Sequence, residues 1–127
     1  SACKHPGNSC SQQGWSDAYH YVFCMTNSLE EDVIVDFYRP LDGGVQGPGI
    51  EFGDGRTAAA IPLSVTIPAG ETTCFTIHAN NMGNSSNGEM RLWYNFTYEN
   101  EFGVEVNVND VTPYTGTNDL PPCGTCV

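Results

Sequence analysis

The stretch YHYVFCMT, residues 19–26, alternates large apolar side chains with smaller or polar ones. Successive side chains of a β-strand point to opposite faces, so the odd-numbered residues of this stretch would share one face. The stretch TTCFTIHA, residues 72–79, follows the same pattern and also carries a cysteine at an even position. We therefore predict two strands whose odd-numbered residues enter a core, while Cys24 and Cys74 face outward or lie beneath a terminal arm.

A disulfide between Cys24 and Cys74 would set the register of these two strands. If the strands are antiparallel neighbours, the same register places Phe23 opposite Phe75 and His20 opposite His78. The Cβ atoms of such a pair lie about 5 Å apart, so two imidazoles could share a Zn²⁺ or Cu²⁺ ion or titrate together. His20 and His78 are therefore candidate metal ligands, with a third ligand that the sequence does not identify. A different pairing of the six cysteines would separate them.

Four further period-2 stretches predict strands at 33–38, 61–67, 90–98 and 102–109. The core residues are odd-numbered in the first two and even-numbered in the last two: Val33, Val35, Phe37, Ile61, Leu63, Val65, Ile67, Tyr94, Phe96, Tyr98, Phe102, Val104, Val106 and Val108. A three-residue loop, 99–101, would place Tyr98 opposite Phe102. We expect an all-β fold, a disulfide-stapled antiparallel β-sandwich with irregular N- and C-terminal arms, forming one domain over residues 1–127.

The remaining cysteines lie at the two ends of the chain, at Cys3, Cys10, Cys123 and Cys126. Only Val127 follows the terminal CxxC, so no helix dipole could activate it as a redox centre. We expect the four to tie one arm to the other, with either cross-pairing open. An even number of cysteines in a small chain is typical of secreted domains, and the absence of a leader-like segment suggests a mature N-terminus. The sequons at Asn84 and Asn95 are candidate glycosylation sites of an extracellular protein.

Four Lys and Arg residues against fifteen Asp and Glu give a formal net charge of −11. So few cations cannot form the basic surface that binds nucleic acid, and an anionic membrane surface is disfavoured for the same reason. No apolar run approaches the roughly 18 residues of a membrane-spanning helix. Solubility is the simplest reading of the acidity. The alternatives are cation binding, a cationic partner or an acidic medium.

Residues 41–56 contain six of the fourteen glycines. The spacing fits no phosphate-binding loop, and the segment carries three acids against one arginine. We predict a long, flexible surface loop, which could serve as a binding loop on a rigid sandwich. Oxygen ligands for Ca²⁺ are available at Asp42, Glu51, Asp54 and in the run 107–110, although none matches an EF-hand.

The outer face of the last two predicted strands suggests a glycan site. Trp93, Asn95 and Thr97 would lie beside Glu105, Asn107 and Asn109. An indole can stack on a pyranose while amides and carboxylates bind its hydroxyl groups, so Trp93, Glu105 and Asn107 are the candidate ligand-binding residues. The alternative is that Trp93 packs under a loop or a terminal arm. A glycan on Asn95 would cover this platform.

No HExxH or GxSxG motif occurs, and no catalytic residue is assigned. Residues 62–77 resemble the strand–turn–strand hairpins of many sandwich domains, and no residue role is transferred from them. We expect a secreted, non-enzymatic module that binds a glycan, a cell wall or a foreign cell-surface component and requires no cofactor. One alternative is a protein-directed toxin, effector or inhibitor that acts through 41–56. Another is a small hydrolase or a metal-dependent oxidase using His20 and His78.

Overall fold

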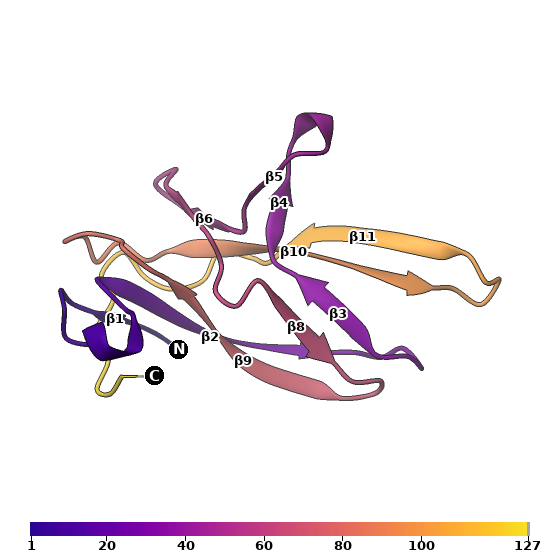
Figure 1. Ribbon diagram of the computed structural model, residues 1–127, viewed down its shortest axis with the longest axis horizontal. Coiled ribbons are helices and arrows are strands. Elements are labelled where there is room, and N and C mark those ends of the chain that lie inside the picture. Colours follow the sequence, from indigo (N-terminus) through magenta and orange to yellow (C-terminus); the bar gives the residue numbers. More distant parts are fainter. Residues whose placement is uncertain (127) are drawn as a thin grey trace.

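The computed structural model describes residues 1–126 and is built from antiparallel β-sheets (Figure 1). The first layer is a three-stranded sheet in the order β1-β2-β9, and the second is a six-stranded sheet in the order β7-β6-β10-β3-β8 with β11 also paired to β10. A ribbon of two strands, β4 and β5, projects from the second layer. The elements are β1 (Ala2–His5), η1 (Ser11–Gln13), β2 (Ala18–Thr26), β3 (Val33–Asp36), β4 (Tyr38–Pro40), η2 (Asp42–Gly44), β5 (Gln46–Pro48), β6 (Ile50–Phe52), β7 (Thr57–Ala58), β8 (Ser64–Ile67), β9 (Thr72–Ala79), β10 (Met90–Glu99) and β11 (Glu105–Val111).

The predicted pairing of the first two strands is confirmed. Strands β2 and β9 are antiparallel neighbours, with Phe23 opposite Phe75 and His20 opposite His78. Cys24 and Cys74 are directly opposite each other, joined by a disulfide and exposed. The alternation of apolar and polar side chains and one covalent bridge thus specify the same register.

The core follows the predicted odd-even pattern in most strands. Its buried members include Tyr19, Tyr21, Val33, Val35, Phe37, Ile67, Ile77 and Ala79. The prediction for 61–67 is wrong in its first half, because β8 begins at Ser64 and both Ile61 and Leu63 are exposed. Ile61 instead forms an isolated bridge with His78 of the first sheet. Pro62, which has no N–H group, cannot continue that ladder, and the chain then reaches the second sheet.

The register predicted for the last hairpin is wrong by four residues. Tyr98 lies opposite Val106, and the loop spans 100–104 instead of 99–101. Within it the Asn100 side chain accepts hydrogen bonds from the N–H groups of Phe102 and Val104, and Gly103 has a positive φ of 74°, which glycine adopts without strain. Because the error is an even number, the residues keep their predicted faces. Phe102 and Val104, however, are exposed in the loop.

The glycine-rich segment is also more ordered than predicted. It contains β5, the second strand of the projecting ribbon, and β6. Strand β6 pairs with β10, with Ile50 opposite Leu92. Ile50 and Phe52 are fully buried. Gly49 permits this path, since a Cβ atom there would lie 2.5 Å from the carbonyl oxygen of Phe37. The short alternation Ile-Glu-Phe is therefore a core strand within a glycine-rich segment.

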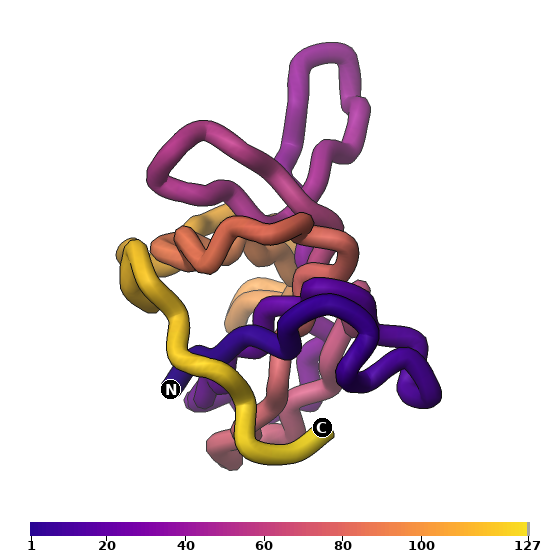
Figure 2. The backbone as a smooth tube through the Cα atoms, turned by 90° about the vertical axis from the view of Figure 1, so that its left-hand side faces the viewer, coloured from indigo at the N-terminus to yellow at the C-terminus, as the bar shows by residue number. Residues whose placement is uncertain are grey.

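The two terminal arms lie side by side (Figure 2). Disulfides join Cys3 to Cys123 and Cys10 to Cys126, which resolves the cross-pairing that the sequence leaves open. The N-terminal arm is less irregular than predicted, because β1 pairs with β2 and Lys4 bridges to Pro122 of the other arm. The Lys4 ammonium donates to the carbonyl groups of Gly83 and Ser85, both at 2.6 Å.

Within residues 1–126 we find no helix long and apolar enough to cross a bilayer.

Candidate functional site

A polar hollow of about 220 Å³ lies on the outer face of the second sheet. It forms where Asn95 of β10 is flanked by Asp36 of β3 on one side and Asn109 of β11 on the other. The next position along the same face pairs Thr97 with Asn107. The remaining lining residues are Tyr38, Phe96 and Val108. Three adjacent strands thus present two rows of amide, carboxylate and hydroxyl groups to one small space.

Hydrogen bonds hold part of this lining in place. The Thr97 hydroxyl donates to Asn107 Oδ1 at 2.6 Å, and Asn95 Nδ2 donates to the Tyr38 carbonyl oxygen at 3.4 Å. Within residues 1–126, no hydrogen bond engages the side chain of Asp36 or Asn109. The hollow therefore combines pre-positioned amides with a carboxylate and an amide that remain available to a ligand.

Of the three residues predicted to bind a ligand, only Asn107 lines the hollow. Glu105 lies opposite Glu99, at the loop end of the hairpin. Trp93 is half-buried in a separate charged cluster, where its Nε1–H donates to Glu51 at 2.9 Å. The guanidinium groups of Arg39 and Arg91 each lie 5.6 Å from its ring centroid. The indole is half-buried and already paired with these groups, and its role in binding a ligand stays a prediction.

Glu51 is the centre of that cluster. It accepts two hydrogen bonds from Arg91, at 3.2 and 2.9 Å, and Arg39 lies at 3.8 Å. The hydrogen bond from Arg91 is the main reason that the pKa of Glu51 is lowered, and the same bond raises the pKa of Arg91. Both groups stay charged over the ordinary pH range, and they keep the Trp93 side chain fixed on β10, the central strand of the hollow.

The chain matches no protein-family model, no curated protein sequence and no solved structure.

The two sequons differ in their surroundings. Asn84 is exposed in the 80–89 connection, whereas Asn95 is 7% exposed and uses Nδ2, the atom that would carry a glycan, as a donor to Tyr38. The Asn84 side chain is therefore accessible in this fold and the Asn95 amide is not, while glycosylation at either site stays a prediction.

All three histidines gather beneath the terminal arms. The His20 ring contacts His5 and His78 edge-on, with centroids 4.2 and 4.1 Å apart, and Trp15 stacks on His78 at 4.3 Å. His20 is 3% exposed, and neither of its ring nitrogens has a hydrogen-bond partner. Burial, with the neighbouring charges of His78 and His5, lowers the pKa of His20 to about 3, and burial also lowers the pKa of His5.

The cluster brings the predicted metal ligands His20 and His78 together and adds a third imidazole, His5, but these three histidines do not form one of the groups whose ligand atoms lie close enough to hold a metal. Within the described chain, the His, Cys, Asp and Glu groups with ligand atoms close enough for a metal are Cys3-His20-Cys123 and His5-Cys10-Cys126. Their cysteines are all in disulfides. A Zn²⁺ or Cu²⁺ site at His20 and His78 thus stays a prediction, and the cluster's evident role is to pack the arms against the first sheet.

The acids predicted to bind Ca²⁺ are distributed over different contacts. Glu51 pairs with Arg91, and Asp54 pairs with Arg56 at 2.8 Å, while Asp42 lies exposed in η2. The hollow's acid, Asp36, was missed. Its even position in a strand with an odd-numbered core face already placed it outside, but the neighbour of that strand could not be deduced from the sequence.

Proposed function

We propose that this protein is a secreted, non-enzymatic binding module that recognises a saccharide in the polar hollow on β3, β10 and β11. The observation that carries the proposal is the lining itself, in which carboxylate, amide and hydroxyl side chains of three strands converge beside Tyr38. Such groups bind sugar hydroxyls, and an adjacent aromatic residue offers an apolar edge to the ring. A volume of about 220 Å³ suits one sugar unit of a longer chain.

Secretion is supported by the three disulfides, which persist in oxidising compartments. The exposed Asn84 sequon agrees with an extracellular route. The ligand class that fits this location is a glycan of a cell wall or of a foreign cell surface.

A glycan array probed with the wild-type protein, with and without Ca²⁺, tests the proposal. A saccharide found there is then titrated by calorimetry against Asn107→Ala and Asp36→Asn. We expect each variant to bind at least about tenfold more weakly, because Asn107→Ala removes a hydrogen-bonding side chain from the hollow and Asp36→Asn replaces a charged acceptor with a neutral amide. The matched control is Asn118→Ala, which removes an exposed amide from the C-terminal arm.

Two results would contradict the proposal. One is an array on which the wild-type protein retains no saccharide. The other is saccharide binding that survives both hollow variants and is lost in Trp93→Ala, which would place the binding site at the Trp93 indole.

A second candidate function, a protein-directed effector or inhibitor acting through 41–56, is favoured by one observation. The β4–β5 ribbon projects from the body of the fold (Figure 1), with Leu41 and Val45 at 43% and 57% exposed. Exposed apolar side chains on a projecting hairpin are typical of contacts with another protein. Cross-linking to extracellular proteins of a target cell, compared with Leu41→Ser/Val45→Ser, would identify this function by the loss of a specific product.

A further inference from the structure

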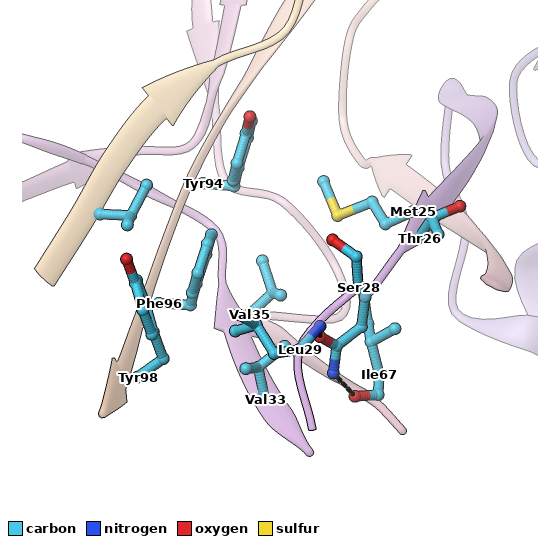
Figure 3. Close-up of a pocket in the computed structure, with 12 residues that line it drawn as sticks. Met25, Thr26, Ser28, Leu29, Val33, Val35, Ile67, Tyr94, Phe96 and Tyr98 are labelled. Carbon is cyan, nitrogen blue, oxygen red and sulfur yellow. Dashed lines mark hydrogen bonds between the residues drawn. The ribbon is translucent and has the colours of Figure 1, made fainter. Parts of the chain in front are cut away.

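A second cavity, of about 500 Å³, is lined by residues of both sheets (Figure 3). The strand ends that contribute them lie at the end of the fold away from the chain termini (Figure 1). Tyr94, Phe96 and Tyr98 of β10 form one wall, and Met25 of β2 lies on the other side. Val33 and Val35 of β3 lie between them. Cavities of roughly 300–1,000 Å³ with mainly apolar and aromatic walls are the usual sites of small molecules.

The strand pairing explains why the cavity is open. Strand β10 pairs with β3 at a single position, Asn95 with Asp36, and the β10–β11 hairpin continues beyond it (Figure 1). On the opposite layer β2 ends at Thr26. The chain then turns through Asn27, whose side chain hydrogen-bonds to Glu31, Ile67 and Leu29. The aromatic side chains on the inner face of β10 are consequently only half-buried.

The mouth of the cavity is acidic. An adjoining hollow shares Leu29 and Tyr98 with the cavity, and its other lining residues are Glu30, Glu31, Glu99, Asn100 and Glu101. The protein's four cations are engaged with other acids: Lys4 with Asp17, Arg39 and Arg91 with Glu51, and Arg56 with Asp54. No Lys or Arg among residues 1–126 lines either space. The negative charge at the mouth therefore lacks a counter-charge from the chain itself.

We propose that this cavity binds a small amphiphilic cation, with its apolar tail between the sheets and its ammonium group among the glutamates of the mouth. Charge complementarity selects the head group, because a fatty carboxylate would be repelled and a neutral alcohol would gain only the burial of its tail. This site goes beyond the proposed saccharide function. The two spaces share Phe96 and Val108 in their linings, but the cavity takes Tyr94 and Tyr98 from the even-numbered face of β10. The polar hollow takes Asn95 and Thr97 from the odd-numbered face.

Calorimetry with two ligands of matched tail length and one with a shorter tail tests the proposal. Decylammonium, decanoate and the short-tailed butylammonium are titrated separately into the wild-type protein, below their micellar concentrations. We expect decylammonium to bind with 1:1 stoichiometry and both other ligands to bind at least about tenfold more weakly. The affinity for decylammonium should fall as NaCl is raised, since salt screens the exposed glutamates.

Two double variants with the same change in net charge separate the site from the overall acidity. Glu30→Gln/Glu101→Gln should bring the affinities for decylammonium and decanoate together. Asp42→Asn/Asp119→Asn, at exposed positions away from the mouth, should leave the preference unchanged. Met25 is the one of the three methionines that lines the cavity, so its methyl NMR resonance should shift with saturation while those of Met82 and Met90 move less.

Equal affinity for decanoate and decylammonium would overturn the proposal, and so would equal effects of the two double variants. Binding of a basic leucine–lysine peptide in place of decylammonium would also overturn it, by assigning the surface to a protein partner. The Asn107→Ala variant should bind decylammonium like the wild-type protein, so failure of the saccharide site and failure of this site are distinguishable.

Discussion

The two ends of the sandwich are built in opposite ways. At the end that carries the termini, two disulfides join the arms, the three histidines pack together, and the buried Lys4 bonds to the 80–89 connection. At the other end, the β10–β11 hairpin extends past its single pairing with β3, and Phe102 is 79% exposed. Covalent and buried contacts thus stabilise one end, which leaves the other free to keep an open apolar cavity with an acidic mouth.

Loss of the arm disulfides is the change that should affect the closed end most. With one bridge intact the other closes only a short loop, so Cys3→Ser/Cys123→Ser should cost about 3 kcal/mol. Removing both bridges releases a loop of 120 residues and should cost roughly 7 kcal/mol, most of the stability of such a domain. Urea unfolding measures both free energies. The comparison is Cys24→Ala/Cys74→Ala, which removes the disulfide between β2 and β9.

If the two arm bridges proved additive, each costing the same with or without the other, the arms would not act as one fastening. The chain-entropy argument for the closed end would then fail.

Acid should weaken the closed end before the rest of the fold. The unfolded chain protonates histidine near pH 6.5, whereas burial lowers the pKa of His20 to about 3 in the folded protein. The folded state therefore binds fewer protons in this range, and stability falls as the pH decreases below 6.5. We expect a loss of about 2 kcal/mol between pH 7 and pH 5 from His20, and His5 acts in the same direction.

Chemical denaturation at several pH values would measure this loss, with His20→Phe as the variant whose curve should be flatter. The lowered pKa values of Glu51 and Asp54 add a loss only below about pH 4.5. A wild-type protein as stable at pH 5 as at pH 7 would contradict the buried, neutral state of His20.

Between the two ends, the Glu51 cluster should have an intermediate effect. Glu51→Gln keeps the volume but removes the charge that Arg91 and Trp93 share. Because the pair is partly exposed to solvent, we expect a loss of about 1 kcal/mol and faster hydrogen exchange at the Trp93 indole N–H. Glu105→Gln, which removes an exposed acid without a cationic partner, should change neither quantity, and an equal effect of both variants would remove the cluster's special role.

The sequence predicted the parts of the fold in which two independent signals agree. Cys24 and Cys74 fall in register with Phe23 and Phe75, so β2 and β9, including the His20–His78 contact, follow from the chain alone. Where only one signal exists the prediction failed. Alternation extended the last strand back to Phe102, because the Asn100 side chain that organises the loop is visible only in three dimensions.

Only some residues of the candidate site could be placed from the sequence. Asn95, Thr97, Asn107 and Asn109 could be placed on one outer face because parity survives an even error in register. Asp36 could not be placed beside them, since strand order in a sheet is set by tertiary packing. The inter-sheet cavity was missed for the same reason: its walls, Met25 and Phe96, are ordinary core residues until the layers are seen to diverge.

The smallest effect is expected at the tip of the open end, and a matched pair of phenylalanines measures it. Phe52→Ala should cost about 4 kcal/mol, because that side chain is 2% exposed in the core. Phe102→Ala, at 79% exposed, should change the free energy of unfolding by less than about 0.5 kcal/mol. A large loss at Phe102 in urea unfolding would mean that the tip folds back onto the cavity mouth in solution. The apolar walls would then be covered by the chain itself, and the contrast between a fastened end and an open one would disappear.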